Sequence, residues 1–191
     1  MKIFKCKNNQ KGYFEGPCIF EPEIHSDERG SFFESWNMRS FNKYINKEIY
    51  FVQDNQSISR KGVLRGMHYQ LPPMEQGKLV RCTYGSVYDV IVDLRKNSST
   101  YSLWSGTKLN SYLNNQLWVP PGFAHGFLSL EEGTIFEYKV TNYWSKNHEK
   151  SLYWQDPIVN ISWPSDSNFK ISEKDKKAFS IKTLEMNNFL F

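Results

Sequence analysis

Short apolar stretches that alternate with polar residues cover most of the chain and predict a protein built from β-strands. The segment TIFEYKVTNYW, residues 134–144, alternates strictly, as a strand with one buried face does. The segment KLVRCTYGSVYDVIVDLR, residues 78–95, predicts two strands about a turn at residues 84–86. Further extended segments are expected at residues 13–36, with a polar turn at residues 25–30, and at residues 50–59.

Helical periodicity is confined to two short segments. Residues 38–49, MRSFNKYINKEI, carry apolar residues at helical spacing and predict one amphipathic helix. Residues 172–179, SEKDKKAF, predict a second helix with Ser172 as its cap. Many short strands with few helices indicate an all-β protein, a double-sheet jelly roll or a barrel. With 191 residues, the chain is expected to form one domain, residues 1–191.

Two glycine-containing segments are expected to bend the chain. Pro120–Pro121–Gly122 interrupts the β-rich segment 116–130, because proline removes ladder donors and glycine permits a sharp bend. In GVLRGMHYQ, residues 62–70, Arg65 and His68 would face opposite ways on a regular strand. A β-bulge at Gly66 would aim both side chains into one cavity, and an uninterrupted pairing of residues 65–68 would contradict it.

Composition and charge narrow the class of ligand. The formal net charge is +4, but lysines and carboxylates are interleaved without a basic stripe, which argues against nucleic-acid binding. A mildly basic protein still suits a small anionic ligand. The three cysteines, Cys6, Cys18 and Cys82, have no metal-ligand spacing and are expected to be free thiols in a reducing compartment. No apolar leader or membrane-spanning run is present, so a cytoplasmic protein is expected.

Three polar side chains fall on apolar strand faces. Lys78 shares a face with Val80 and Cys82, which places it either at the rim of the sheet or in a ligand cavity. Tyr138 is on the face of Phe136, where a core role is the simpler interpretation. His125 aligns with neighbouring phenylalanines and is either a core histidine or a site residue.

A metal site is only half formed in the sequence. His68, Glu75 and His125 fit part of the ligand pattern of metal-binding cupin barrels. The position of the second histidine in that pattern is Gln70, which is a poor ligand for a transition metal. The pattern therefore favours a cupin-like barrel and argues against a metal centre.

Several motifs in the right order resemble a known enzyme family. GVLRGMHYQLPP, QGKLVRCTYGSVYDVIVDLR, QLWVPPGFAHGF, EYKVTNYW and SEKD together resemble the dTDP-4-dehydrorhamnose 3,5-epimerases, which are nucleotide-sugar enzymes of the cupin jelly-roll class. The resemblance runs over residues 16–178. It implies a cupin-type double-stranded β-helix and a metal-independent isomerase in cell-surface polysaccharide biosynthesis.

The resemblance also implies roles for individual residues. His68 matches the family's proton acceptor, Tyr138 its proton donor, and Asp175 the partner of the histidine. Lys78 matches the lysine of QGKLVR and is the candidate donor to an enolate oxygen. The remaining matched positions imply contacts with the substrate at Arg29, Phe32, Glu34, Gln53, Asp54, Asn55, Arg65, His125, Glu149 and Lys174.

The implied chemistry needs these residue types. A 4-keto sugar has acidified C–H bonds at C3 and C5, so epimerisation needs a base on one face, an acid on the other and an enolate between them. Histidine is suited to the base because it titrates near neutral pH. The mechanism requires no cofactor. The implied ligand is a nucleotide-diphosphate sugar, and the implied assembly is a homodimer in which the segment with Arg29 reaches the partner's site.

The sequence leaves the exact substrate and the site of epimerisation open. The segments KSLYW (150–154) and KKAF (176–179) depart from the family pattern, outside the acid–base residues. The motifs do not distinguish dTDP from GDP, a hexose from a heptose, or epimerisation at C3 from epimerisation at both carbons. A GDP-4-keto-heptose epimerase of a capsule pathway, a 3,4-ketoisomerase and a non-catalytic nucleotide-sugar binder are the alternatives.

Overall fold

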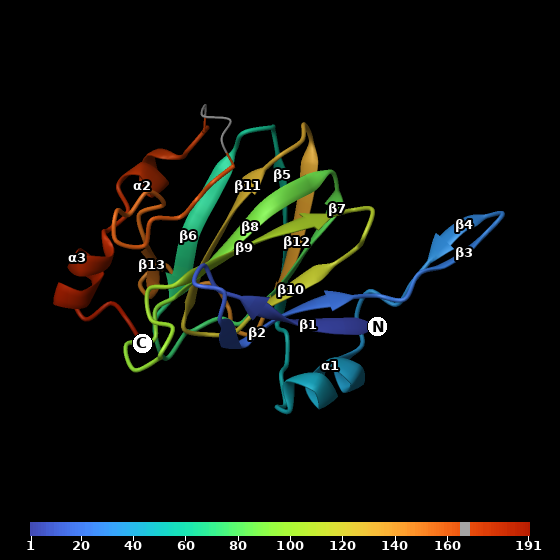
Figure 1. Ribbon diagram of the computed structural model, residues 1–191, viewed down its shortest axis with the longest axis horizontal. Helices are drawn as coiled ribbons and strands as arrows, with labels where there is room; N and C mark the ends of the chain where they lie inside the picture. Colours follow the sequence, from blue (N-terminus) through green and yellow to red (C-terminus); the bar gives the residue numbers. More distant parts are fainter. Residues whose placement is uncertain (165–168) are drawn as a thin grey trace.

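Two antiparallel β-sheets form the body of the protein in the computed structural model, which describes residues 1–164 and 169–191 (Figure 1). The predicted all-β architecture with a few short helices is thereby confirmed. The elements in chain order are β1 (Lys2–Lys7), β2 (Tyr13–Glu21), β3 (His25–Asp27), β4 (Gly30–Phe32), α1 (Met38–Ile45), β5 (Gln53–Ser59), β6 (Leu64–Gln70), β7 (Lys78–Tyr84), β8 (Ser86–Asp93), β9 (Trp104–Asn110), β10 (Gln116–Val119), β11 (Phe123–Ser129), β12 (Thr134–Val140), β13 (Glu149–Ser151), α2 (Glu173–Lys176) and α3 (Ile181–Met186).

From β5 onward, every connection between consecutive strands except that between β8 and β9 carries the chain from one sheet to the other. The six-stranded sheet has the order β1-β2-β10-β7-β12-β5, and the five-stranded sheet has the order β13-β6-β11-β8-β9. Gly85 therefore joins two strands of different sheets and is a corner, with a positive φ of 74° that glycine accommodates. The segment at residues 120–122 is another such corner, between β10 and β11, as its sequence predicts.

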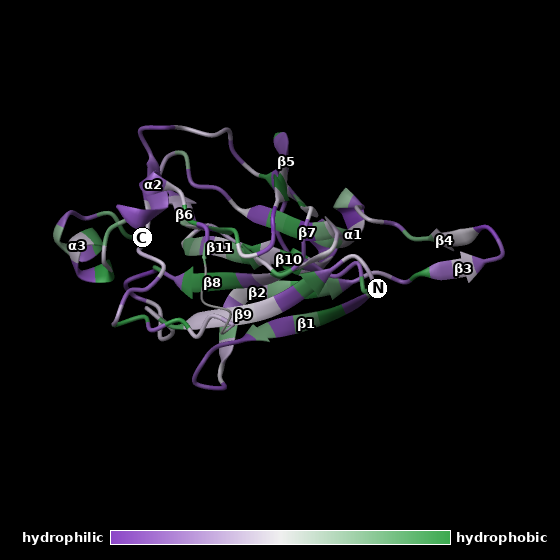
Figure 2. Ribbon diagram, turned by 90° about the horizontal axis from the view of Figure 1, so that it is seen from above, coloured by the Kyte–Doolittle hydropathy of each residue, from purple (hydrophilic) through white to green (hydrophobic). Residues whose placement is uncertain are grey.

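The interior between the sheets is apolar. Val80 on β7 and Phe136 on β12 meet Ile91 on β8 and Phe127 on β11 in one buried cluster. Hydrophobic residues cover most of β8, whereas the small hairpin of β3 and β4 is largely polar (Figure 2). Burial of these alternating faces stabilises both sheets together, at about 25 cal/mol for each Å² of apolar surface.

Short helices cover the outer faces of the sheets. Phe41 of α1 packs with Leu79 and Trp118 on the six-stranded sheet. Ile181 and Leu184 of α3 pack with apolar residues of the five-stranded sheet. Helices α1 and α3 thus bury apolar residues on the outer faces of the two sheets.

The helices and edge strands differ in part from the sequence predictions. The helix expected over residues 38–49 ends at Ile45, because Asn46 takes a left-handed conformation with φ 55°. The helix expected over residues 172–179 is only the four-residue α2, capped by Ser172 as predicted. The sequence analysis missed β1, β9, β13 and α3, which are short or polar and gain their stability from pairing and packing.

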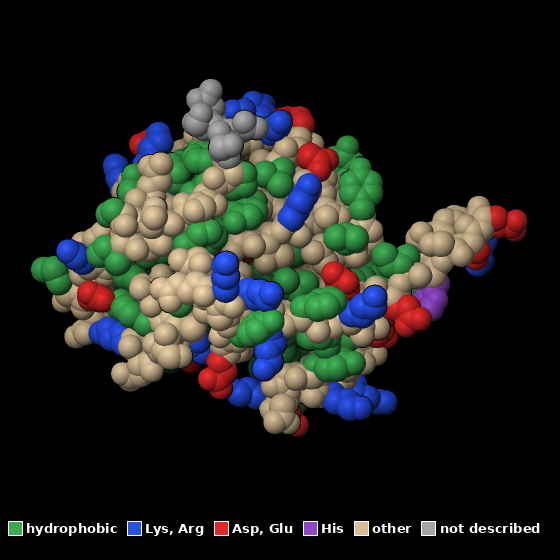
Figure 3. All heavy atoms as spheres, in the orientation of Figure 1, with side chains coloured by type: hydrophobic (Ala, Val, Ile, Leu, Met, Phe, Trp, Pro, Cys, Tyr) green, Lys and Arg blue, Asp and Glu red, His purple; other side chains and the backbone are tan. Residues whose placement is uncertain are grey.

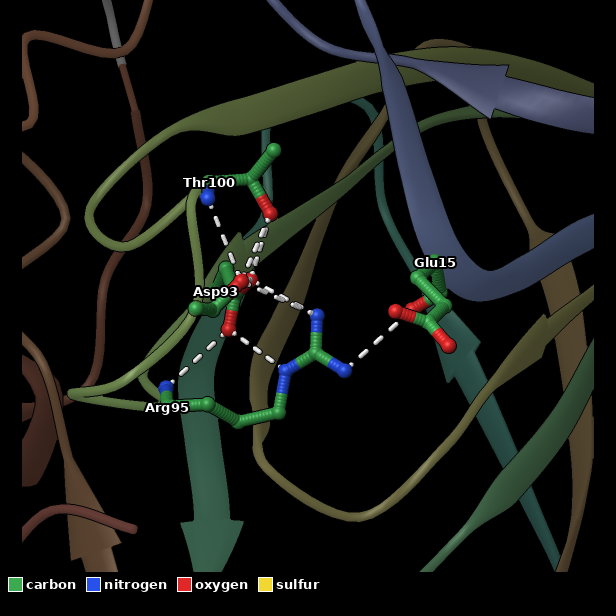
Figure 4. Close-up of polar contacts among 5 residues, drawn as sticks. Glu15, Asp93, Arg95 and Thr100 are labelled. Carbon is green, nitrogen blue, oxygen red and sulfur yellow. Dashed lines mark hydrogen bonds and ion pairs between the residues drawn. The ribbon is translucent and has the colours of Figure 1, made fainter.

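A polar cluster fixes the loop after β8 next to the corner at residues 120–122 (Figure 4). The buried Asp93 accepts two hydrogen bonds of 2.8 Å from the guanidinium of Arg95 and one of 2.7 Å from Thr100. Arg95 also donates to the backbone oxygen of Glu15 on β2 and lies 4.6 Å from the ring centroid of Phe123. This cluster ties the start of β11, and so the strand that carries His125, to both sheets.

The hairpin of β3 and β4 projects away from the sandwich (Figure 1). Its tip carries Asp27 and Arg29, which form an ion pair with each other, and Phe32 at its base is 74% exposed. On the face drawn in Figure 3, cationic and anionic side chains are interspersed among hydrophobic ones over the body of the molecule. The visible surface therefore has the mixed charge that the sequence indicates.

Candidate active site

Two adjoining cavities open at one end of the sandwich, and His68, Lys78 and Tyr138 line both of them. The first cavity, of about 380 Å³, is also lined by Ser57, Val63, Leu64, Arg65, His125, Gly126, Phe127, Phe136, Lys170, Ser172, Lys174 and Asp175. The second, of about 310 Å³, is also lined by Gln53, Asn55, Tyr69, Gln70, Gln76, Trp144 and Glu149. The three shared residues therefore stand at the centre of one elongated cleft.

His68 and Asp175 form a close pair inside the cleft. The Nε2 atom of His68 lies 2.6 Å from Oδ1 of Asp175, whose side chain is only 5% exposed. Burial opposes ionisation of Asp175, but the hydrogen bond and charge of His68 outweigh it and hold the pKa of this carboxyl below its usual value. With Nε2 engaged by the carboxylate, Nδ1 is the ring nitrogen left to take a proton from a ligand.

A β-bulge at Gly66 aims Arg65 and His68 into the same cavity, as the sequence predicts. His125 pairs with His68 and Phe127 pairs with Arg65, so two steps along β11 match three steps along β6. Gly66 has φ 135°, and a Cβ atom at this position would lie 2.5 Å from the Cα of Gly126. Only glycine fits both the conformation and the contact between these strands.

Tyr138 faces the cleft from the sheet opposite His68. It lies on β12 of the six-stranded sheet, whereas His68 lies on β6 of the five-stranded sheet. Burial and the nearby charge of Glu149 raise the pKa of Tyr138, against the smaller effect of Arg65. The phenol therefore keeps its proton near neutral pH and is available as an acid.

Lys78 lines both cavities together with His68 and Tyr138. Its side chain is buried, and Nζ donates a 3.2 Å hydrogen bond to the backbone oxygen of His68. Burial lowers the pKa of Lys78 to about 8, against the opposing effect of the carboxylates Glu149 and Asp89. Of the two placements that the sequence allows for Lys78, the structure has the one in a cavity and not the one at the rim of the sheet.

His125 belongs to a second histidine–aspartate pair that sequence reasoning found only in part. Its Nε2 atom lies 2.9 Å and 3.0 Å from the two carboxylate oxygens of Asp89, and both residues are buried. Burial raises the pKa of Asp89, although the charge of His125 works against it. The sequence did contain a sign that Asp89 is a site residue, because this acidic residue shares a strand face with the apolar Val87 and Ile91.

Cationic and amide side chains occupy different parts of the cleft. Arg65 and Lys174 line the first cavity, and Arg65 donates to Ser59 Oγ at 3.2 Å. In the second cavity Gln53 donates to Asn55 Oδ1 at 2.7 Å. The structure thus brings these four predicted binding residues together around His68.

Glu149 and Lys174 link the two parts of the cleft. The ammonium of Lys174 lies 2.6 Å from Oε2 of Glu149. Burial opposes ionisation of Glu149, but the hydrogen bond and charge of Lys174 outweigh it and hold the pKa of Glu149 below its usual value. Of the two charges, the ammonium of Lys174 is the more exposed and is the one available to an anionic ligand.

Four predicted binding residues lie elsewhere on the chain. Arg29 and Phe32 belong to the projecting hairpin, and Glu34 follows it and accepts a hydrogen bond from Asn37. Asp54 forms an ion pair of 2.8 Å with Lys139. Asp54 and Lys139 line a further cavity of about 330 Å³, which shares Asn55 and Tyr138 with the second cavity of the cleft.

Sequence reasoning missed further polar and aromatic lining residues, among them Trp144, Gln76 and Ser57. Trp144 is 56% exposed and presents an indole at the second cavity. Gln76 lines the same cavity and donates to the backbone oxygen of Asn142 at 2.7 Å. Ser57 lines the first cavity with a buried hydroxyl that has no hydrogen-bond partner among the described residues. The position of Trp144 directly after the EYK strand was the available signal.

In the described part of the chain, no three His, Cys, Asp or Glu side chains converge as metal ligands. Gln70 instead binds backbone, donating to Met74 and Tyr143 and accepting from Ser145. The cysteines are free and buried. Among residues 1–164 and 169–191, no helix is long and apolar enough to cross a membrane.

Comparison with known proteins gives a consistent set of relatives. The family model described as dTDP-4-dehydrorhamnose 3,5-epimerase matches residues 11–183. A dTDP-4-dehydrorhamnose 3,5-epimerase of Shigella flexneri is 50% identical over 157 residues, which cover 82% of this chain and 86% of that protein. The enzyme of the same name from Escherichia coli K12 is 44% identical, with 89% of this chain and 92% of that protein covered.

Solved structures extend the similarity to the fold. A dTDP-6-deoxy-D-glucose-3,5-epimerase of Legionella pneumophila in complex with dTDP-4-keto-L-rhamnose has a TM-score of 0.90 and 38% identity, covering 99% of this chain and 97% of that one. A 3'-monoepimerase of Streptomyces bikiniensis in complex with dTDP-quinovose has a TM-score of 0.87 and 32% identity, covering 92% and 89%. The predicted cupin-type jelly roll is confirmed by these neighbours.

Proposed function

This chain belongs to the dTDP-4-dehydrorhamnose 3,5-epimerase family, and on that premise we propose that it inverts C3 and C5 of a dTDP-linked 4-keto-6-deoxy sugar. The observation that carries the proposal is the pair of His68 with Asp175 on one wall of the cleft, facing Tyr138 on the other. A base and an acid on opposite walls are what an epimerase needs and a binding protein does not.

His68 acts as the base in this proposal. Its Nδ1 atom takes the proton from a carbon next to the keto group, and the electron pair of the broken C–H bond moves into an enolate. Asp175 keeps the imidazole in the tautomer with hydrogen on Nε2 and stabilises the imidazolium that forms. General base help of this kind is worth ~10² to ~10⁴ in rate.

Tyr138 and Lys78 complete the inversion. The phenol of Tyr138 donates its proton to the opposite face of the carbon, which reverses its configuration. The ammonium of Lys78 stabilises the enolate oxygen in a site that excludes water, where one well-placed donor is worth about 3–4 kcal/mol. His125, held by Asp89, belongs to the same polar cluster around the reacting ring.

The cleft has complementary groups for the rest of the nucleotide sugar. Arg65 and Lys174 are the proposed diphosphate ligands, since charge-assisted hydrogen bonds to phosphate are strong. Gln53 and Asn55 are proposed to bind the polar groups of the nucleotide. The exposed indole of Trp144 offers a face on which a nucleobase stacks. The solved relatives in complex with dTDP-4-keto-L-rhamnose and dTDP-quinovose support this class of ligand.

The projecting hairpin is proposed to complete the site of a second copy of the chain. Arg29, Phe32 and Glu34 are exposed or partly exposed and far from His68 in the fold, yet they carry groups suited to a diphosphate and a nucleobase. In a homodimer in which each hairpin reaches the partner's cleft, these residues would contact the nucleotide bound there. Arg29→Ala is expected to raise KM and leave kcat unchanged, and mixing it with a His68→Ala variant tests whether hairpin and cleft come from different copies.

The proposed unit of function is one domain, residues 1–191, acting in the cytoplasm. The apolar cluster between the sheets draws on β1, β2 and β7 to β12, which supports one folding unit. Buried free thiols at Cys6, Cys18 and Cys82 suit a reducing compartment.

The experiment that tests the function is turnover of dTDP-4-keto-6-deoxy-D-glucose followed by NMR of the sugar ring. We expect ring couplings that report inversion at both C3 and C5, and loss of both in His68→Ala. Inversion at C3 alone would place the enzyme with the 3'-monoepimerases. Turnover of a GDP-linked 4-keto heptose but not of the dTDP-linked hexose would refute the proposed substrate.

A further inference from the structure

The C-terminal segment, residues 184–191, lies behind the catalytic wall and outside the region that the family model matches, residues 11–183. It packs on the outer face of the five-stranded sheet, where Leu184 and Leu190 join a buried cluster with Met67 and Leu152. In Figure 1 the C-terminus and α3 lie at the same edge of the molecule as β6 and β13. This edge carries His68 and Glu149.

Strand β13 needs support from outside because it is three residues long and lies at the edge of its sheet. Among the described strands it pairs with β6 alone, in the register Glu149–Gln70, Lys150–Tyr69 and Ser151–His68. Residues paired across antiparallel strands share a face, and faces alternate along each strand. Tyr69 and Lys150 therefore lie on the sheet face opposite that of His68 and Glu149, and although Tyr69 also borders the second cavity, its hydroxyl is directed to the C-terminal segment.

Both of these outward side chains are bound by one residue of the C-terminal segment. The hydroxyl of Tyr69 donates a 2.6 Å hydrogen bond to the backbone oxygen of Phe189. The ammonium of Lys150 lies 4.8 Å from the centroid of the Phe189 ring, a cation–π contact. Phe189 thus bridges β6 and β13 at the level of the catalytic histidine.

The end of the segment is fixed to a third strand. The backbone of Phe191 donates to the oxygen of Leu94 at 3.2 Å and accepts from the N–H of Lys96 at 2.9 Å. These residues directly follow β8, which carries Asp89 and pairs with β11. The segment therefore connects the edge strands to the rigid centre of the five-stranded sheet.

We propose that residues 184–191 are a positioning clamp in which Phe189, through Tyr69 and Lys150, sets the positions of His68 and Glu149. The proposal rests on the proposed function for its effect on catalysis. Tyr69 is a positioning residue here, since its hydroxyl is bound to the C-terminal segment behind the cleft and acts on the reaction through His68.

Tyr101 supplies a matched control for Tyr69. Its hydroxyl donates a 2.6 Å hydrogen bond to Glu185 of the same C-terminal segment, but it lies in the loop between β8 and β9 and not on β6, the strand of His68. Tyr69→Phe and Tyr101→Phe each remove one phenolic hydroxyl from the same segment. Only the first loses a contact behind His68.

The test compares the two variants in steady-state kinetics and in proton NMR of the intact protein. We expect Tyr69→Phe to lower kcat about tenfold, less than the ~10² that a 1 Å misplacement costs, with KM within about twofold. The downfield resonance of the proton between His68 and Asp175, assigned by its loss in Asp175→Asn, is expected to shift. Tyr101→Phe should leave kcat and the resonance as in the wild type.

A second pair of variants separates positioning from stability. Phe189→Ala removes the ring that binds Lys150 and is expected to lower kcat, whereas Phe189→Tyr keeps the ring face and should restore it. Wild-type kcat and an unshifted resonance in Tyr69→Phe, or equal losses in both tyrosine variants, would overturn the clamp. A shifted resonance in Tyr69→Phe beside an inactive wild type would uphold the clamp and refute the proposed function.

Discussion

Replacement of Asp175 by asparagine removes one charge from the cleft and changes little else in shape. Oδ1 of Asp175 accepts the hydrogen bond from Nε2 of His68 at 2.6 Å, and Oδ2 lies 3.5 Å from the N–H of Gly66. The side-chain amide that Asp175→Asn introduces can still meet Gly66 with its oxygen. Its NH₂ group would then face His68 and donate to Nε2, which moves the ring hydrogen to Nδ1 and removes the basic lone pair from the substrate side.

The expected loss follows from these two changes. A base in the wrong tautomer costs up to ~10⁴ in kcat, and loss of general base help alone costs at least ~10². We expect kcat of Asp175→Asn to fall ~10³-fold, which corresponds to about 4 kcal/mol in activation free energy. KM should change little, because the proposed diphosphate ligands Arg65 and Lys174 are untouched.

The assay is steady-state turnover of dTDP-4-keto-6-deoxy-D-glucose with thermal unfolding measured in parallel. Asp156→Asn is the matched control, since Asp156 is also buried and accepts hydrogen bonds from the backbone of Ile158 and Ile181, away from the cleft. It should lower stability and leave kcat unchanged. A kcat for Asp175→Asn within about threefold of the wild type would show that the carboxylate does not set the tautomer of His68.

Three further predictions address other parts of the cleft. Tyr138→Phe should abolish net inversion and retain proton exchange on the His68 face, measured by NMR in D₂O; inversion at the wild-type rate would exclude Tyr138 as the acid. Since Lys78 acts as a cation and its pKa is lowered to about 8, kcat should fall as pH rises through about 8. In Lys78→Arg that alkaline limb should move to higher pH, and a limb that stays in place would belong to another group. Gly66→Ala should lower both stability and kcat, because the added Cβ meets Gly126; a thermal midpoint equal to the wild type would contradict this steric account.

Much of the fold could be predicted from local sequence because its signals are local. Alternation in residues 134–144 gave β12, and the proline–glycine corner at residues 120–122 gave the change of sheet between β10 and β11. Strand β13 and helix α3 could not be predicted, since three residues carry no periodicity and α3 is stabilised by burial of Ile181 and Leu184 on the sheet.

The site likewise contains some features that local sequence predicts and others that only tertiary packing creates. The bulge at Gly66 followed from face analysis of a single strand, whereas the same analysis left Lys78 either at the rim of the sheet or in a cavity. The partner of His125 did not follow from it, because Asp89 is 36 residues away and only the pairing of β8 with β11 brings the two together. The buried hydroxyl of Ser57 and the clamp at Phe189 are likewise products of tertiary packing.

The central claim is that His68 and Tyr138 exchange protons at two carbons of one bound sugar. The most direct measurement is the mass of the product formed from dTDP-4-keto-6-deoxy-D-glucose in D₂O under single-turnover conditions. The account predicts a gain of two deuterons with the wild-type enzyme and none with His68→Ala. Product that carries no deuterium, or deuterium incorporated equally by His68→Ala, would contradict it.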